Sequence, residues 1–341
     1  MKMKAPSQPW SPWQLLYGGA HRLRRRWYQG RSRRLPRPVV SVGNLHWGGS
    51  GKTPLVATLA AHLRDRGLAV CVLSRGYASR GRGVRVVSVG EGPLLGPLLA
   101  GDEPVLLAGE LPGVAVVVGA DRHRAGIHAL HRLSPPPDVF LLDDGFSHLA
   151  LQRDLDLVAF PAADPFGGGR LPPAGRLREP LASMARAHAA VLTGSEAYDG
   201  SGAALAEALH PYGFTGPGFT SVTRPATPRR IGGGDLPSGT RVFLVSAVAR
   251  PEAFAEMARR LGLEIAGELR FPDHHDYPPP SLARIADAWR ESGAETVLAT
   301  AKDRVKLHGR LDVPLAEMPI RAEPEPAFWE WLDGEIKKLW R

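Results

Sequence analysis

Residues 39–54 read Val39-Val40-Ser41-Val42-Gly43-Asn44-Leu45-His46-Trp47-Gly48-Gly49-Ser50-Gly51-Lys52-Thr53-Pro54. A short run of β-branched residues gives way to a glycine-rich turn, and after Gly-Lys-Thr a helical pattern follows, with leucines at positions 55, 59 and 63. A strand, a glycine loop and a helix in this order are typical of a phosphate-binding loop. The stretch therefore predicts an α/β domain whose first long helix begins at a phosphate group.

The residue types in this loop suit phosphate binding. Glycine has no Cβ and adopts positive φ cheaply, so it lets backbone N–H groups approach phosphate oxygens. The N-terminus of the following helix adds the positive end of its dipole. Lys52 is expected to reach the β- and γ-phosphates of a nucleotide, and the Thr53 hydroxyl is expected to bind Mg²⁺. The residues expected around the phosphates are Gly48, Gly49, Ser50, Gly51, Lys52 and Thr53.

His46 departs from the pattern G-x-x-x-x-G-K-[ST], which has glycine at that position. A chance Gly-Lys-Thr in a glycine-rich chain is the alternative interpretation. The strand before the loop and the helix after it favour the functional interpretation, because they supply the structural context that the motif requires.

A second motif is an apolar strand that ends in two carboxylates, Val139-Phe140-Leu141-Leu142-Asp143-Asp144-Gly145-Phe146. Enzymes with a phosphate-binding loop hold Mg²⁺ with a carboxylate from such a strand end. Two adjacent carboxylates also repel each other unless a cation lies between them. An Asp at a strand end often serves only the turn, but together with the upstream loop the pair favours a metal site opposite Thr53.

Composition limits the class of protein. With 341 residues and 43% apolar content, the chain is long enough for two globular domains. Its single cysteine, Cys71, lies in an apolar run typical of a buried strand, so we expect a reduced, intracellular protein without a disulfide. Pro, Gly and charged residues interrupt every apolar run before 18 residues, and no membrane-spanning helix is expected.

The basic charge is concentrated in residues 1–38, which contain ten Lys or Arg residues and no Asp or Glu. Apolar residues recur in this arm at spacings of three and four, beside the arginines: Trp13, Leu16, Tyr17, Ala20, Leu23 and Trp27. A basic amphipathic helix of this kind suits an anionic membrane surface. Packing against the rest of the chain is a second interpretation, compatible with the first, and a nucleic-acid-binding arm is a third. The arm lacks the continuous apolar segment of a signal peptide.

Four segments follow from the composition along the chain. We expect an arm at 1–38, a phosphate-binding α/β domain at 39–212, a Gly- and Pro-rich linker at 213–240, and a second α/β domain at 241–341. Asp102 precedes an apolar helical run, where Asp is most often an N-cap. Residues 273–276 read Asp-His-His-Asp and could form a metal cluster, but adjacent histidines in one loop point apart, which favours a single functional histidine.

Seven segments in the same order resemble the tetraacyldisaccharide 4′-kinases, the lipid A 4′-kinase family. They are Val42 to Pro54, Ser74-Arg75-Gly76-Tyr77, Gly101-Asp102-Glu103-Pro104, Asp143 to His148, Leu177-Arg178-Glu179-Pro180, Phe271-x-Asp273-His274 and Thr300-x-Lys302-Asp303. The resemblance implies a P-loop NTPase-like α/β/α domain joined by a short β-ribbon to a smaller α/β/α domain. It also implies transfer of the γ-phosphoryl group of ATP to the 4′-hydroxyl of a tetraacylated glucosamine disaccharide 1-phosphate, forming lipid IVA.

The resemblance also implies roles for single residues. Lys52 and Thr53 would bind phosphate and Mg²⁺, Asp143 and Asp144 would form the metal site, and Asp102 with His274 would accept the hydroxyl proton. The residues implied to line the site are Tyr77, Arg122, His148, Arg178 and Glu179. Three positions depart from the family's usual residues: Ser147 where Gln is usual, Ala247 where Gly is usual, and Ala301 where Glu is usual. The family also lacks the first glycine of the loop pattern.

Two other classes of protein are alternatives to this interpretation. A partner-switching ATPase of the deviant Walker type also combines a phosphate-binding loop with an amphipathic helix, but it needs a lysine where this chain has Trp47. A nucleic-acid-dependent ATPase is supported only by the charge of the arm. The resemblance implies a peripheral enzyme at the cytoplasmic face of the bacterial inner membrane. Its expected partners are a lipid disaccharide 1-phosphate and an anionic membrane surface, without nucleic acid or an obligate protein partner.

Overall fold

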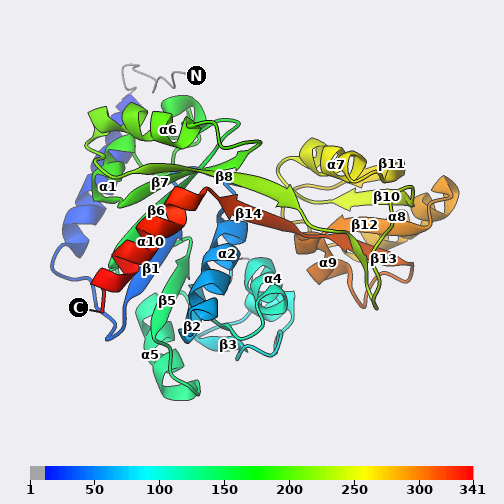
Figure 1. Cartoon of the computed structure of the whole chain (residues 1–341), viewed down its shortest axis with the longest axis horizontal. Coiled ribbons are helices and arrows are strands. Elements are labelled where there is room, and N and C mark those ends of the chain that lie inside the picture. The colour runs from blue at the N-terminus through cyan, green and yellow to red at the C-terminus, as the bar shows by residue number, and fades with distance from the viewer. Residues whose placement is uncertain (1–11, 78, 341) are drawn as a thin grey trace.

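A computed structural model describes residues 12–77 and 79–340 of the chain, which form two lobes joined by extended strands (Figure 1). The larger lobe contains a nine-stranded sheet in the order β14-β8-β7-β6-β1-β5-β2-β4-β3. β3 and β14 are antiparallel to their neighbours, and the strands between them run parallel. The strands are β1 Val39–Gly43, β2 Val70–Ser74, β3 Arg85–Ser88, β4 Ala115–Val118, β5 Val139–Asp143, β6 Leu155–Pro161, β7 Ala189–Ser195, β8 Gly218–Pro225 and β14 Ile320–Pro324.

Helices cover both faces of this sheet. The α-helices are α1 Pro12–Tyr28, α2 Lys52–Asp65, α3 Pro97–Ala100, α4 Asp102–Glu110, α5 Arg122–Arg132, α6 Ser201–Leu209 and α10 Pro326–Lys338, with 3₁₀ turns at η1 Gly167–Gly169, η2 Leu181–Arg186 and η3 His210–Tyr212. α2, α4 and α10 contribute to one apolar core, whereas α5 and α6 contribute to two others. The central strands are buried at every residue, because helices lie on both sides of a parallel sheet.

The smaller lobe repeats this architecture around five strands in the order β11-β10-β12-β13-β9. Its elements are β9 Arg229–Arg230, β10 Arg241–Ser246, α7 Pro251–Arg260, β11 Glu264–Arg270, α8 Pro279–Ser292, β12 Thr296–Thr300, α9 Ala301–Leu307 and β13 Leu315–Met318. One core packs under α7 and another under α8, on opposite faces of the sheet. The predicted α/β/α class is therefore confirmed for both lobes.

The division of the chain differs from the predicted boundary at 241–341. β14 pairs with β8 in the larger lobe, and Phe328, Leu332 and Ile336 of α10 lie in the same core as Leu55. Figure 1 shows α10, in red, lying against the larger lobe near α2. The chain leaves this lobe through β8 and returns through β14, and these antiparallel strands form the ribbon between the lobes. Part of the predicted linker, at 218–225, is thus an integral strand of the large sheet.

The N-terminal arm forms a helix, as its spacing predicts, although its first eleven residues lie outside the described ones. α1 turns Gln14, Gly18 and His21 toward the larger lobe. Its apolar residues face outward instead, with Trp13, Leu16, Leu23 and Trp27 at least 60% exposed. Across residues 12–77 and 79–340, each helix is too short or too polar to cross a membrane.

Candidate active site

The phosphate-binding loop connects β1 to α2 in a conformation that requires its glycines. Gly51 has φ of 66° and caps the start of α2, and a Cβ there would lie 3.0 Å from the Cβ of Thr193. The Thr193 hydroxyl donates a hydrogen bond to the Ser50 carbonyl at 2.7 Å, and the Asn44 amide donates to the Ser50 hydroxyl at 2.7 Å. These two hydrogen bonds hold the loop against β7 and against the end of β1.

A second segment pairs with the loop along its backbone. The Trp47 N–H donates to the Arg176 carbonyl at 2.8 Å, and the Arg178 N–H donates to the Leu45 carbonyl at 2.6 Å. His46 lies between these two bonds and is 4% exposed, with its ring edge-on to Phe160. Burial lowers the pKa of His46 to about 4, so the ring is neutral at neutral pH. This histidine is therefore a packed structural residue of the loop.

The acidic pair lies beside the loop, as predicted, because β5 is the neighbour of β1. The Lys52 ammonium forms an ion pair with Oδ1 of Asp144 at 3.2 Å. The Arg178 guanidinium donates hydrogen bonds to both carboxylate oxygens of Asp144, at 2.7 and 3.0 Å. Arg178 also donates to the side-chain oxygen of Asn44. Burial alone would raise the pKa of Asp144, but Lys52 and Arg178 hold it well below its usual range.

Asp143 has the opposite electrostatic environment. Its side chain is 2% exposed, and its Oδ1 has no hydrogen-bond partner among the described residues. Burial, with the charges of Glu103 and Asp144, raises the pKa of Asp143 to about 7. A buried carboxylate oxygen without a donor is costly unless a cation or proton satisfies it. Two carboxylates and the Thr53 hydroxyl are oxygen ligands of the kind that Mg²⁺ prefers. In phosphoryl-transfer sites this ion binds one or two carboxylates together with substrate phosphates.

Asp102 and His274 come from different lobes and contact each other where the lobes meet. Asp102 is the first residue of α4, and His274 lies in the loop after β11 with φ of 63°. The Nδ1 of His274 lies 3.5 Å from Oδ2 of Asp102, and the Tyr77 ring packs edge-on to His274 at 5.6 Å between centroids. Burial raises the pKa of Asp102, but the bond to His274 and the charge of Lys306 outweigh it and leave the pKa below its usual value.

The Asp-His-His-Asp segment does not converge on one point. His274 faces Asp102, whereas His275 bonds to the Ser281 hydroxyl at 2.9 Å and stacks on Phe271. In the described part of the chain, no group of three or more His, Cys, Asp or Glu side chains is arranged to hold a metal.

Of the remaining predicted residues, Arg122 interacts electrostatically with both carboxylates of the acidic pair, whereas His148 lies near Arg122. Arg122 begins α5 and is 3% exposed, and its guanidinium donates to the Ala120 carbonyl at 3.1 Å. Burial and the charge of Arg75 lower the pKa of Arg122 to about 10, while both carboxylates of the pair oppose this shift. Burial lowers the pKa of His148 to about 4.

Glu179 follows Arg178 but does not face the open site. Its carboxylate is 2% exposed and accepts the Ser147 hydroxyl at 2.5 Å and the Arg186 guanidinium at 2.9 Å. The third partner is His21 of α1 at 3.3 Å. Glu179 thus joins the arm to the segment that follows the acidic pair, a role that its motif alone did not indicate.

Two lysines of α9 also belong to the site, and sequence reasoning singled out only the first. Lys302 lies 3.2 Å from Nε2 of His274, and Lys306 lies 3.0 Å from Oδ2 of Asp102. The spacing of four residues within a helical run was the available signal, since such residues share a helix face.

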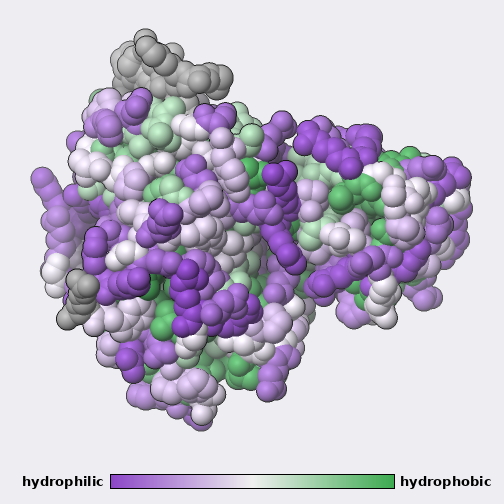
Figure 2. All heavy atoms as spheres, in the orientation of Figure 1, coloured by the Kyte–Doolittle hydropathy of each residue, from purple (hydrophilic) through white to green (hydrophobic). Residues whose placement is uncertain are grey.

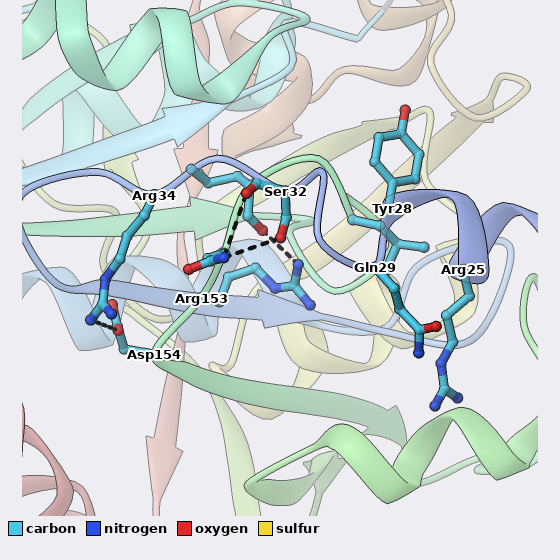
Figure 3. A pocket seen from close by; sticks show the side chains of 10 residues that line it. Arg25, Tyr28, Gln29, Ser32, Arg34, Arg153 and Asp154 are labelled. Carbon is cyan, nitrogen blue, oxygen red and sulfur yellow. Dashed lines mark hydrogen bonds and ion pairs between the residues drawn. The ribbon is translucent and has the colours of Figure 1, made fainter.

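Two hollows lie at the end of α1. The first, of about 400 Å³, is lined by Arg25, Tyr28 and Arg34 among others, and Figure 3 shows Arg34 paired with Asp154 while Arg25 points away from that pair. The second, of about 440 Å³, includes His148. On the face of the described residues drawn in Figure 2, hydrophilic side chains cover much of both lobes and the hydrophobic ones form smaller, separate groups.

Comparison with known proteins shows the family to which the chain belongs. A sequence model for the family described as Tetraacyldisaccharide-1-P 4'-kinase matches residues 8–337. The Tetraacyldisaccharide 4'-kinase of Pelobacter propionicus is 41% identical over 310 residues, covering 87% of this chain and 82% of that protein. The Geobacter sulfurreducens protein of the same name is 40% identical over 307 residues, covering 87% and 83%.

The fold has a solved counterpart. A crystal structure of LpxK from Aquifex aeolicus in complex with ATP superposes with a TM-score of 0.76 at 32% identity, covering 97% of this chain and 98% of that one. The two-lobed fold is therefore shared with that structure, and the chain belongs to the tetraacyldisaccharide-1-phosphate 4′-kinase family.

Proposed function

We propose that this protein transfers the γ-phosphoryl group of ATP to the 4′-hydroxyl of a tetraacylated glucosamine disaccharide 1-phosphate, in the biosynthesis of lipid A. Membership of the family supports this reaction. The observation that supports it most is that Lys52 lies beside the acidic pair, while Asp102 of the same lobe pairs with His274 of the other lobe.

The reaction needs the phosphates held in place and their charge neutralised more than it needs covalent chemistry. The backbone N–H groups of the glycine loop and the start of α2 bind the phosphate oxygens, and Lys52 turns from Asp144 to the β- and γ-phosphates. Asp143, Asp144 and Thr53 would hold Mg²⁺, which neutralises charge on these phosphates when bound.

The acceptor hydroxyl is activated by Asp102 and His274, which contact each other between the lobes. Asp102 accepts the proton of the 4′-hydroxyl while the oxygen forms its bond to the γ-phosphorus. The bond from that phosphorus to the β-phosphate oxygen breaks, and ADP leaves with the electron pair. His274 orients the carboxylate, since its Nδ1 faces Oδ2.

We further propose that α1 attaches the enzyme to an anionic membrane surface, at the cytoplasmic face of the inner membrane where ATP is available. A helix that packs on its own protein normally buries its apolar side chains. α1 does the reverse, since Gln14, Gly18 and His21 are buried whereas Leu16 and Leu23 are exposed. Exposed apolar residues beside arginines suit the boundary between lipid head groups and acyl chains.

The direct test is incubation with ATP labelled at the γ-phosphate, Mg²⁺ and a tetraacylated disaccharide 1-phosphate lipid. We expect a doubly phosphorylated lipid, and a fall in its rate of about a hundredfold or more for Lys52→Ala, which removes a charge that stabilises the transition state. Lys337→Ala, exposed on α10, serves as the matched control and should retain the wild-type rate. ATP hydrolysis without lipid phosphorylation, or hydrolysis stimulated by DNA, would overturn the proposal.

A further inference from the structure

Three leucines are exposed on the segment that leads into α4. Leu94, Leu98 and Leu99 are 60%, 58% and 45% exposed. A single exposed leucine is common on protein surfaces, but three within six residues form an apolar patch, and such patches mark interaction sites. Leu95, between them, packs against the core of the larger lobe instead.

The backbone holds these leucines in place. The Leu94 N–H donates to the Val87 carbonyl of β3 at 2.7 Å, and the Gly101 N–H donates to the Pro97 carbonyl at 2.7 Å. Ala100, at the end of α3, is fully buried. The leucine side chains are therefore presented to solvent by a segment that is itself anchored to the larger lobe.

Arginines lie beside the leucines. The Arg80 N–H donates to the Leu98 carbonyl at 2.8 Å, so the loop that carries Arg80 and Arg82 runs along α3. Both arginines are exposed, and within residues 12–77 and 79–340 neither guanidinium forms an ion pair with a carboxylate. Residues 79–101 contain three arginines against a single acidic residue, Glu91. Unpaired arginines beside exposed leucines complement the head groups and acyl chains of anionic lipids.

This surface lies at the same edge of the large sheet as α1. β2 and β5 are adjacent parallel strands, so the chain leaves both strands at one edge. The loop with Arg80 follows β2, whereas α1 bonds to the Ser147 carbonyl in the loop after β5. Leu99 also stands three residues before Asp102. A bilayer that delivers a lipid head group to the Asp102–His274 pair therefore comes close to these leucines.

We propose that Leu94, Leu98, Leu99, Arg80 and Arg82 form a second membrane contact, the Leu–Arg surface, which binds the head groups and outer acyl chains of an anionic phospholipid bilayer. The inference rests on the proposed function, in which the acceptor is a membrane lipid. Together with α1, this contact holds the carboxyl edge of the sheet against the bilayer from two sides of the acidic pair.

The test measures cosedimentation with phospholipid vesicles that contain no disaccharide lipid. One set is made of phosphatidylcholine alone, and the other of phosphatidylcholine mixed with phosphatidylglycerol, which is anionic. Each substitution is made in the wild-type chain and in the chain that also carries Trp13→Ser, Leu16→Ser and Leu23→Ser. The second background isolates the Leu–Arg surface, because it removes apolar side chains of α1.

Leu98→Ser combined with Leu99→Ser should lower binding to the anionic vesicles about tenfold in both backgrounds, because two apolar side chains no longer enter the lipid. Leu98→Met with Leu99→Met is the matched control, since it keeps the apolar surface and should retain binding. ATP binding, measured by calorimetry, should be unchanged in both variants, which shows that they are folded.

Arg80→Gln combined with Arg82→Gln should also lower binding about tenfold, but to the anionic vesicles alone, because the lost attraction is electrostatic. Arg37→Gln with Arg132→Gln removes the same charge at the opposite edge of the sheet, where both arginines are exposed. This control should bind like its parent protein.

Equal vesicle binding by the Leu98→Ser, Leu99→Ser variant and its parent in both backgrounds would overturn the inference. Two other results would also overturn it. A loss of binding seen only with disaccharide lipid in the vesicles would assign the leucines to the substrate's own acyl chains. A wild-type dimer that these two substitutions dissociate in sedimentation velocity would assign them to a second copy of the chain. Failure of the wild type to phosphorylate the disaccharide lipid would instead contradict the proposed function, which these vesicles do not test.

Discussion

His46 stands where the phosphate-binding pattern has glycine, and its surroundings explain how a large ring is tolerated there. The ring is buried between the loop and the segment at 176–178, and a Cβ built on Gly167 would lie 2.5 Å from its Cδ2. Gly167 thus provides the space that the ring takes up. The glycine loop and the segment that carries Arg178 are held together through this packing.

Burial of His46 predicts a pH dependence of stability. The pKa of His46 is about 4 in the folded state and 6.5 in the unfolded state, so unfolding binds a proton between these values. The contribution of neutral His46 to the free energy of unfolding is therefore fully present above pH 6.5, and it is lost as the pH falls toward 4. Between pH 7.5 and pH 5.5, the free energy of unfolding of the wild type should fall by about 1.4 kcal/mol more than that of His46→Phe, because only the wild type has this histidine to protonate on unfolding. Urea denaturation at the two pH values measures the difference. An unchanged difference would contradict this prediction, and exposed His210→Phe is the control.

Residues within a local motif could be predicted from the sequence, whereas their partners in other segments could not. Lys52 and Asp144 were identified because a glycine loop and an acidic strand end have recognisable patterns, and their contact follows from adjacent parallel strands. Lys306 reads as an ordinary surface charge on a short helix. Only the docking of α9 against α4 buries it beside Asp102, and no local pattern encodes that docking.

Among the elements, α1 has the most unusual relation to the rest of the molecule. His21 reaches the buried Glu179, the Tyr17 hydroxyl donates to the Arg178 carbonyl at 3.2 Å, and Arg24 donates to the Ser147 carbonyl at 3.2 Å. The helix is thus attached by polar contacts to residues next to the acidic pair. Its spacing predicted a helix with an apolar stripe, but not the face that packs, since a polar face can also make specific contacts.

Substitutions on the exposed face of α1 separate membrane attachment from folding. We expect Trp13→Ser, Leu16→Ser and Leu23→Ser, combined, to lower binding to anionic phospholipid vesicles at least tenfold, because three side chains lose roughly 1.5–3 kcal/mol each on leaving the lipid. Cosedimentation measures this binding. His21→Ala is the matched control, since it alters the packed face and should retain vesicle binding. Equal sedimentation of the triple variant and the wild type would show that α1 is only structural.

At the scale of the whole molecule, the site is assembled from two lobes that the chain connects twice. β8 leads out, β14 leads back, and the Ala226 N–H donates to the Pro319 carbonyl at 2.8 Å beside the ends of these strands. The smaller lobe also approaches the loop, since a Cβ on Gly49 would lie 3.7 Å from that of Ala249. The composition of the chain indicated a second domain. It did not indicate that α10 packs against the larger lobe, because the amphipathic pattern of α10 fits either lobe.

The double connection allows the smaller lobe to be removed without breaking the larger one. Replacing residues 227–318 with Asn-Gly joins the paired Ala226 and Pro319 by a two-residue hairpin turn. We expect the remaining lobe to fold, with some loss of stability because Ala301 and Val305 no longer cover α4. It should bind Mg²⁺ and ATP in calorimetry through the loop and acidic pair, and Lys52→Ala in the same background should weaken that binding.

Transfer to the lipid should be lost in this shortened protein, because the groups that orient Asp102 all come from the excised lobe. Circular dichroism establishes that the lobe is folded, and labelled-phosphate transfer measures the activity. Full-length His274→Asn is the matched comparison, and it should lose transfer while still binding ATP. A folded shortened protein that phosphorylates lipid at the wild-type rate would show that the larger lobe activates the hydroxyl alone. Absence of nucleotide binding would mean that the smaller lobe is needed to shape the glycine loop.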